Sequence, residues 1–431
     1  IEHRLRQSDF RDDAGDPATP WLGQSFNDLE NNQAVLLVGS WLRKDQPMLN
    51  HRVRKSVLAG GQVMAVNPVD YDFNYELSHK LISAPAEMVA QLAGIAAALG
   101  ADTAGIGVKA EAEHQLIADT LKAAEQGLVL LGSIAQMHPD YSLLRFLANN
   151  ISQAAGVDLG FVGEGANSVG AWLTGSVPRQ GNGLSLGGML EQGLDACLLL
   201  NVEPEFDSAN PIAMADMLKV AKVIALTTHL SPWLEETADL LLPIAATAET
   251  SGSFVNLQGD VQSFNGAARP VGEARPAWKV LRVLGNLTDQ KDFDYESSTD
   301  VHDEAMQSIG EIKLDNRLGD SQIQTTSFET ADMQRIGGVP LYNVDMLVRR
   351  SRALQHTPDA WKAGLHVHAD TAGQLGLTDG ESAVLRQGEG ELTLPLVVDS
   401  RVPPTCVWMP MGVPGSELLG EGFATVSLEK A

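Results

Sequence analysis

Residues 34–68 read AVLLVGSWLRKDQPMLNHRVRKSVLAGGQVMAVNP, and this stretch decides the fold class. It opens with the continuous apolar run AVLLV and closes with QVMAV, and turn residues follow each run. Such runs are typical of strands that are buried on both faces of a parallel sheet. Apolar residues recur at helical spacing between the two runs, so the stretch predicts a strand, a crossover helix and a second parallel strand.

The same pattern recurs further along the chain. Residues 196–211 read ACLLLNVEPEFDSANP, and a predicted helix connects them to KVIALTTHLSP at 222–232. Further short apolar runs predict strands at 128–131, 159–162 and 240–242. Strands that alternate with helices form parallel sheets with right-handed crossovers, so we expect an α/β protein with two doubly wound parallel-sheet domains.

The last part of the chain has a different sequence pattern. HVHAD, AVLRQ, ELTLPLVVD and TCVWMPM are short predicted strands separated by turn residues, which favours a closing β-barrel. An acidic, polar stretch precedes it. The predicted organisation is a lead-in segment (1–32), a first Rossmann-like domain (33–123), a second Rossmann-like domain (124–288), an acidic linker (289–340) and the β-barrel (341–431).

Composition narrows the classes of function. The 431 residues carry a formal net charge of −25, which repels phosphate backbones, so we expect no nucleic-acid partner. The two cysteines, Cys197 and Cys406, are too few for an iron–sulfur cluster, which needs about four thiolates.

No run approaches the ~18 apolar residues of a membrane span. The start at Ile1 lacks a signal peptide and an initiator Met, so we expect a cytoplasmic chain with a cut or processed start.

Six polar or small residues are the candidate ligand-binding positions. Ligands of open α/β sheets bind at the carboxyl ends of strands, and four of these residues follow predicted strands. Two more lie in the hydroxyl-rich segment TAETSGSFVN. The six are Gly39, Ser40, Asn67, Asn201, Glu249 and Asn256. Neither G-x-G-x-x-G nor G-x-x-x-x-G-K-[ST] occurs at a strand end, so the alternative interpretation is a set of tight turns, one of which tucks Phe254 into the core.

Two further clusters have plain interpretations. His366 and His368 alternate along a predicted strand and share a face, but no second ligand pair accompanies them, so we expect core or surface histidines and no metal site. Arg349, Arg350 and Arg352 follow an apolar run. They are expected to pair with the acidic linker or to contact a partner.

The segment from Leu240 to Gly285 is similar to the signature stretch of the molybdopterin oxidoreductases. The matching positions are Leu242, Pro243, Glu249, Gly252, Ser253, Phe254, Asn256, Gly259 and Gln262. The 34–68 unit and the C-terminal strands resemble other parts of that family. Three phrases, LLVGSWLRKDQPMLNHRVRK, GEGANSVGAWLTG and YNVDMLVRRSRALQHT, resemble the family of large iron–sulfur subunits of bacterial NADH:quinone oxidoreductase, complex I. The resemblance implies a fold of the formate dehydrogenase/DMSO reductase type.

The chain departs from the active members of the molybdopterin oxidoreductase family. They follow the second strand with Asp-Pro-Arg and threonines that hold the dinucleotide of the cofactor, whereas this chain has Asn67-Pro68-Val69-Asp70. The missing Arg and the added acid oppose a pyrophosphate. The part that carries the molybdenum ligand cannot be recognised. We therefore expect a vestigial cleft, with no catalytic residue, no metal ligand and no cofactor in this chain, the iron–sulfur clusters belonging to the full-length subunit.

The resemblance implies a structural role in electron transfer from NADH to quinone. The partners would be other subunits of the peripheral arm of complex I, at the cytoplasmic face of the inner membrane, with membrane contact only through the complex. Two alternatives stay open: an N-terminally truncated molybdopterin-dependent oxidoreductase of the formate dehydrogenase or nitrate reductase type, and a stand-alone binding protein that uses the α/β cleft.

Overall fold

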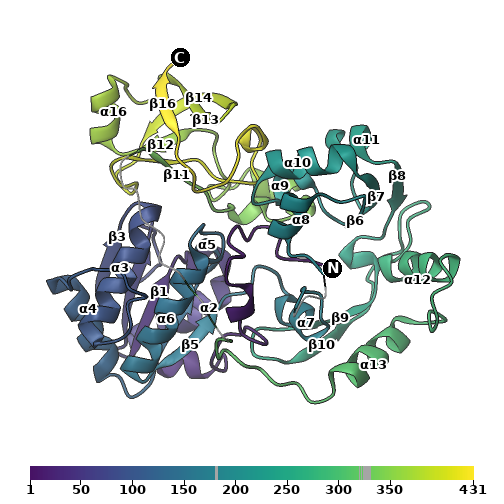
Figure 1. Ribbon diagram of the computed structural model, residues 1–431, viewed down its shortest axis with the longest axis horizontal. Coiled ribbons are helices and arrows are strands. Elements are labelled where there is room, and N and C mark those ends of the chain that lie inside the picture. Colours follow the sequence, from purple (N-terminus) through teal and green to yellow (C-terminus); the bar gives the residue numbers. More distant parts are fainter. Residues whose placement is uncertain (180–182, 320, 322, 324–331) are drawn as a thin grey trace.

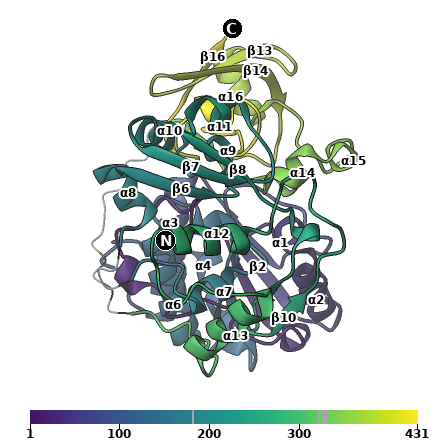
Figure 2. The same cartoon turned by 90° about the vertical axis from the view of Figure 1, so that its right-hand side faces the viewer.

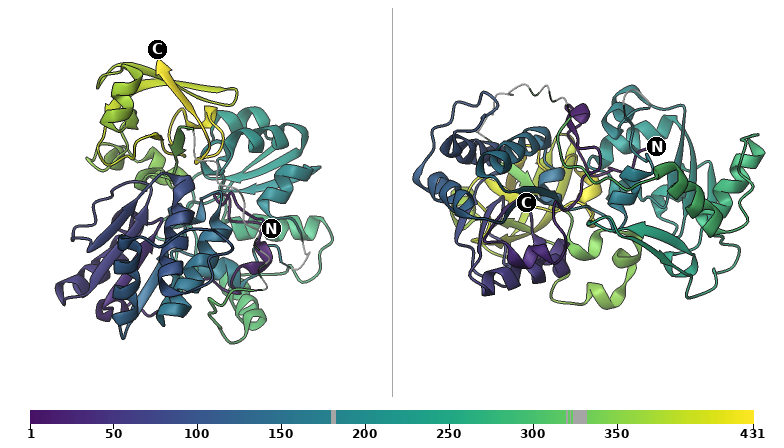
Figure 3. Two further views of the ribbon diagram at one scale, coloured as in Figure 1. Left: turned by 60° about the vertical axis from the view of Figure 1, so that its left-hand side comes forward. Right: turned by 90° about the horizontal axis from the view of Figure 1, so that it is seen from below.

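The computed structural model describes residues 1–179, 183–319, 321, 323 and 332–431. Two α/β units lie beside each other, and a C-terminal sheet lies above both (Figures 1 and 3). An arm of one hairpin and two helices extends from the second unit (Figure 1). This arrangement confirms the expected α/β class with a separate C-terminal β structure.

The first unit is a five-stranded parallel sheet with the order β3-β2-β1-β4-β5. Its strands are β1 (Ala34–Val38), β2 (Gln62–Asn67), β3 (His79–Ile82), β4 (Gly127–Leu131) and β5 (Asp158–Phe161). The predicted domain boundary between residues 123 and 124 is wrong, because β4 pairs directly with β1 and both belong to one sheet. Every residue of β1 and β4 is buried.

Helices cover both faces of this sheet. One face packs against α3 (Pro85–Leu99), α4 (Ala112–Ala123) and α6 (Tyr141–Ala155). The other packs against α1 (Leu42–Asp45), α2 (Pro47–Leu58) and side chains of the C-terminal domain such as Trp408 and Phe423. Alternate residues of β1 therefore enter two different apolar layers, which explains its unbroken apolar sequence.

The second unit is a three-stranded parallel sheet with the order β6-β7-β8. The strands are β6 (Ala196–Leu200), β7 (Lys222–Thr227) and β8 (Leu240–Pro243), and the helices are α8 (Leu186–Gln192), α9 (Pro204–Asp207), α10 (Pro211–Val220) and α11 (Pro232–Thr237). One short helix, α7 (Ser168–Leu173), lies between the units in sequence, and another, α5 (Ser133–Gln136), follows β4. The crossover helices α10 and α11 lie on the same side of the sheet (Figures 1 and 2).

The arm contains the hairpin of β9 (Gly252–Val255) and β10 (Val261–Phe264), then α12 (Ala277–Leu287) and α13 (Ser298–Ile309). The sequence suggested that Phe254 would enter the core. Instead its ring is only half-buried and packs edge-on against Phe264 of the facing strand. A bridge between Ile244 and Arg275 fixes the start of α12 beside the end of β8.

The C-terminal domain is a curled sheet of six strands, a half-barrel in place of the expected closed barrel. Its order is β11-β15-β12-β14-β13-β16, and a bridge between Gln334 and Thr425 links β11 to the residues that lead into β16. The domain begins earlier than the predicted residue 341. Its elements are β11 (Gln334–Ile336), α14 (Met346–Arg350), α15 (Arg352–Gln355), β12 (Leu365–Val367), α16 (Ala369–Leu375), β13 (Ser382–Gln387), β14 (Gly390–Val398), β15 (Cys406–Trp408) and β16 (Ser427–Lys430).

None of the helices in the described ranges combines the length and the hydrophobicity that crossing a bilayer requires.

Candidate functional site

The carboxyl edge of the first sheet is the place where an α/β fold of this order binds ligands. The strand order reverses between β1 and β4, and ligands of open parallel sheets bind outside the strand ends at such a switch point. Ser133 follows β4 at this edge and lines two neighbouring cavities. The groups around this edge are therefore the first candidates for a ligand site.

The polar residues predicted at the ends of β1 and β2 bind each other. The backbone N–H of Ser40 donates to Asn67 Oδ1 at 2.8 Å, and Asn67 Nδ2 donates to the carbonyl of Ser40 at 3.0 Å. Both residues are fully buried. Gly39 has a φ of +53°, and a Cβ there would lie 2.5 Å from the backbone nitrogen of Ala135. The three residues therefore join two strand ends, and the Asn67 amide and the Ser40 backbone are already engaged with each other.

The other three predicted positions are not brought together with them. Asn201 Oδ1 accepts from the N–H of Thr228 in the second unit. Glu249 Oε2 accepts from the N–H of Ala246, and Asn256 Oδ1 accepts from the N–H groups of its own hairpin turn. Glu249 and Asn256 stabilise local turns, as the alternative interpretation of the sequence expected, whereas Asn201 joins the ends of β6 and β7.

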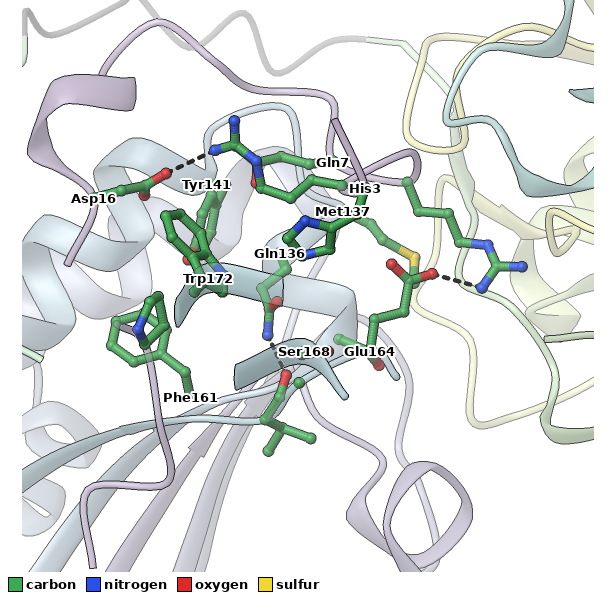
Figure 4. A pocket seen from close by; sticks show the side chains of 16 residues that line it. His3, Gln7, Asp16, Gln136, Met137, Tyr141, Phe161, Glu164, Ser168 and Trp172 are labelled. Atoms are coloured by element: carbon green, nitrogen blue, oxygen red, sulfur yellow. Dashed lines mark hydrogen bonds and ion pairs between the residues drawn. The ribbon is translucent and has the colours of Figure 1, made fainter. Parts of the chain in front are cut away.

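A cavity of about 60 Å³ lies at the carboxyl ends of β4 and β5 (Figure 4). The N-terminal segment crosses this place. Arg6 Nη1 donates to Glu164, Arg6 Nη2 donates to Asp207 at 2.9 Å, and the same nitrogen donates to the carbonyl of Val344 at 2.7 Å. One buried guanidinium therefore contacts the segment after β5, the second unit and the C-terminal domain.

A second cavity, of about 470 Å³, lies between the strand ends of the first sheet and the C-terminal domain, and we call it the aromatic cavity. Its ring-bearing walls are Trp41, Tyr71, Trp361 and Trp408, which together we call the ring quartet. Trp41 stacks on Tyr71 with centroids 4.6 Å apart, and Trp408 meets both rings edge-on. Trp361 lies 5.3 Å from Trp408.

A histidine–aspartate pair stands in one wall of the aromatic cavity. His366 Nδ1 and Asp399 Oδ2 are 3.0 Å apart, and Arg401 Nη2 donates to the same oxygen at 2.7 Å. Burial alone would raise the pKa of Asp399, but hydrogen bonds from His366 and Arg401 outweigh it and hold the pKa below its ordinary value. His368 points elsewhere and caps α16 by accepting from the N–H of Asp370. The two histidines do not form a shared site.

Asp45 also lines the aromatic cavity, and its carboxyl group has an altered acidity. Burial raises the pKa of Asp45 to about 6, although the hydroxyl of Ser133 donates to it at 2.7 Å and opposes this rise. The cations of the cavity are largely neutralised by neighbours, since Arg43 pairs with Asp72 and Lys44 with Asp359. Ring faces with paired charges suit stacking and hydrogen bonding. Among the described residues, no group of three or more potential metal ligands comes together.

Sequence reasoning located the edge of the sheet but missed the aromatic residues that line it. The ring quartet joins positions from 41 to 408, and no spacing in the chain relates them. The only signal was the place of Trp41 and Tyr71 just after two predicted strand ends. The arginine cluster was expected to pair with the acidic linker or to contact a partner. Two of its members, Arg349 and Arg350, instead bind Glu203 at the end of β6.

Two family models match most of this chain. The model described as "Molybdopterin oxidoreductase" matches residues 4–287, and the one described as "Molydopterin dinucleotide binding domain" matches residues 337–427. A solved structure, acetylene hydratase from Pelobacter acetylenicus, superposes with a TM-score of 0.70 at 12% identity, covering 97% of this chain and 80% of that chain. At this identity the likeness concerns the fold alone.

Curated relatives confirm the expected resemblance to the large subunit of complex I. The G subunit of NADH-quinone oxidoreductase from Mycobacterium bovis is 24% identical over 96% of this chain and 52% of its own length. The protein of the same name from Streptomyces coelicolor is 25% identical over 91% of this chain and 49% of its own length. The NADH-ubiquinone oxidoreductase 75 kDa subunit of Reclinomonas americana is 23% identical over 73% of this chain and 42% of its own length. The chain thus spans about half the length of the curated relatives it matches.

Proposed function

The chain belongs to the molybdopterin oxidoreductase family, and on that premise we propose that it is a cofactor-silent structural portion of the large iron–sulfur subunit, the G subunit, of respiratory NADH–quinone oxidoreductase. In this role it supports electron transfer from NADH to quinone without carrying a redox centre of its own. Its partners are other subunits of the peripheral arm, at the cytoplasmic face of the membrane.

The single observation that carries the proposal is the state of the strand ends, which do not fit the family's pterin dinucleotide. The amide of Asn67 and the backbone of Ser40 satisfy each other. Val69 is buried, and the neighbouring Asp70 pairs with Lys80, which neutralises the cation that a pyrophosphate would need. A group that needs backbone and cationic donors at this edge would have to break contacts that the chain already makes.

The smaller of the two cavities at the switch point supports the same conclusion. The cavity beside Arg6 measures about 60 Å³, whereas pockets for small ligands measure roughly 300–1,000 Å³. Arg6 and its three partners occupy the junction between the two α/β units and the C-terminal domain. The chemistry at this junction is that of a structural tether.

The aromatic cavity favours the alternative of a truncated pterin enzyme only by its size of about 470 Å³. Metal analysis of the native membrane assembly separates the two. We expect the chain to co-purify with NADH dehydrogenase activity and the preparation to hold far less than one molybdenum per chain. One molybdenum per chain, or an oxidised pterin released on acid treatment, would establish the enzyme instead.

A further inference from the structure

The second sheet has one face that its own helices leave open. Leu199, Val223 and Ala225 point to the covered face and pack with side chains of α8, α10 and α11 in one apolar cluster. The residues between them point the other way. We call this side the open face, and its exposed or half-exposed side chains are Leu198, Leu200, Ile224, Leu240 and Leu242.

Strand pairing arranges the open face as two aliphatic rows. Leu198, Ile224 and Leu240 are cross-strand neighbours in the first row. Leu200, Leu226 and Leu242 form the second row, in which Leu226 alone is buried. Leu198 and Leu200 are each 44% exposed and Leu240 is 45% exposed. Leucines in a parallel sheet are ordinarily buried, so this exposure is the feature that needs an explanation.

The arm lies on this side of the sheet but leaves it incompletely covered. Figures 1 and 2 place α12 on the side opposite α10 and α11. Within α12 itself, Val283 is 50% exposed and Leu287 is 75% exposed. The outer edge of β6 also has no strand partner in the described part of the chain. An apolar face beside a free strand edge marks a contact surface for another polypeptide segment.

We propose that the open face is a docking surface, and that its occupant is the additional polypeptide that the longer relatives carry. Those relatives are about twice as long as the part that this chain matches. The inference rests on the proposed function and deepens it by assigning a surface to that partner. The contact chemistry is aliphatic, so the occupant presents an amphipathic helix or strand with an apolar side.

Charge argues against a second copy as the occupant. Each copy carries a net charge of −25, so two copies would meet with strong mutual repulsion. A partner with basic residues around an apolar strip suits a chain of this net charge.

The test measures whether the open face is covered in the native assembly. Leu240→Cys introduces a thiol on the open face, and Val220→Cys, at an 81% exposed position that ends α10, is the matched control. The native thiols contribute little background, because burial raises the pKa of both Cys197 and Cys406. Each variant is labelled with a maleimide as the chain alone and within the purified membrane assembly.

We expect the thiol of Leu240→Cys to react about tenfold or more slowly in the assembly than in the chain alone, while that of Val220→Cys reacts equally in both. A photo-crosslinker attached at Leu240→Cys should join a peptide from the half of the relatives' sequence that this chain does not match. Equal reactivity in the two samples overturns the inference. A cross-link to a second copy of the chain, or to any other subunit, overturns the assigned occupant.

A different outcome would contradict the proposed function: the tagged chain would not co-purify with NADH dehydrogenase activity. A second readout uses Leu240→Asp with Val220→Asp as its control. After limited proteolysis that separates the occupant from the tagged chain, the first variant should lower recovery of the occupant with the tagged chain several-fold, and the second should leave recovery unchanged. Equal recovery from both variants contradicts the docking surface.

Discussion

The two parallel sheets of this chain are built from similar strands but are stabilised differently. In the first sheet, the chain supplies an apolar layer on each face, and every residue of β1 is buried. In the second sheet, one face is packed and three leucines of the other are nearly half exposed. The sequences AVLLV and ACLLL look alike, so burial depends on which elements the rest of the chain provides.

Ion pairs hold the second unit in its position, whereas apolar layers hold the first. Glu203, at the end of β6, is fully buried and accepts from Arg349 and Arg350 of the C-terminal domain. Asp207 accepts from Arg6 and Arg349. Burial alone would raise the pKa of Glu203, but the two guanidinium groups lower it below its ordinary value. The placement of the second unit therefore depends on a few charges.

The largest effect is expected from breaking this network. Glu203→Ala removes a buried carboxylate and leaves Arg349 and Arg350 without their main partner. Removing one member of a buried ion pair costs about 3–5 kcal/mol. Calorimetry should show a large fall in the unfolding temperature, and limited proteolysis should cut between β6 and α14. Glu203→Gln, which keeps the shape and some hydrogen bonds, is the control. A loss below about 1 kcal/mol in the free energy of unfolding would mean that these ion pairs contribute little to the stability of the junction.

A matched pair of leucines compares the two sheets directly. Leu36→Ala in the first sheet removes a fully buried side chain and should cost about 2–5 kcal/mol in the free energy of unfolding. Leu198→Ala in the second sheet removes a side chain that is 44% exposed, so we expect about 1 kcal/mol or less in the chain alone. Urea unfolding monitored by circular dichroism measures both. Equal losses would mean that the open face is covered within this chain.

Much of the fold was predictable because buried parallel strands leave a local signature. The runs at 34–38, 62–66, 128–131 and 223–226 all became strands, since continuous apolar runs bounded by turns have few other solutions. The partition into domains was not predictable in the same way. Nothing local to β4 says that it pairs with β1, and the pairing was decided by tertiary packing.

The site was less predictable than the fold, for a physical reason. Asn67 and Ser40 were identified at the correct edge, but a polar residue at a strand end serves a ligand and a neighbouring strand equally well in sequence. The ring quartet and the pair of His366 with Asp399 depend on the C-terminal domain meeting the first sheet. Contacts between distant segments have no periodicity that a single sequence displays.

A smaller effect is expected at the joined strand ends. Asn67→Ala removes the acceptor for the Ser40 N–H and leaves that buried donor without a partner. An unsatisfied buried donor costs about 1–3 kcal/mol. Urea unfolding should show this loss, and Asn256→Ala in the exposed hairpin turn is the control, with a smaller cost. If the two variants lose the same amount, the bond between β1 and β2 is not a special feature of the first sheet.

The smallest expected effect is a difference in how stability depends on pH beside each of the two sheets. Burial raises the pKa of Asp45, beside the first sheet, to about 6 from an ordinary 3.8. The folded state therefore binds this proton more tightly than the unfolded state does. The stability that Asp45 contributes is complete below about pH 4 and is lost as the pH rises through about 6. Glu203, beside the second sheet, has a lowered pKa, so its contribution has the opposite sign and is lost in acid.

Asp45→Asn should remove the first of these trends. Because Asp45 is only partly buried and lines an open cavity, we expect the variant to gain about 1 kcal/mol over the unmodified chain near pH 7.5, and nothing below pH 4. Urea titrations of both proteins across this range measure the difference, and Asp119→Asn on the exposed side of α4 controls for net charge. A difference that does not change with pH would mean that the carboxyl of Asp45 is already solvated. The charges beside the two sheets would then no longer respond to acid in opposite directions.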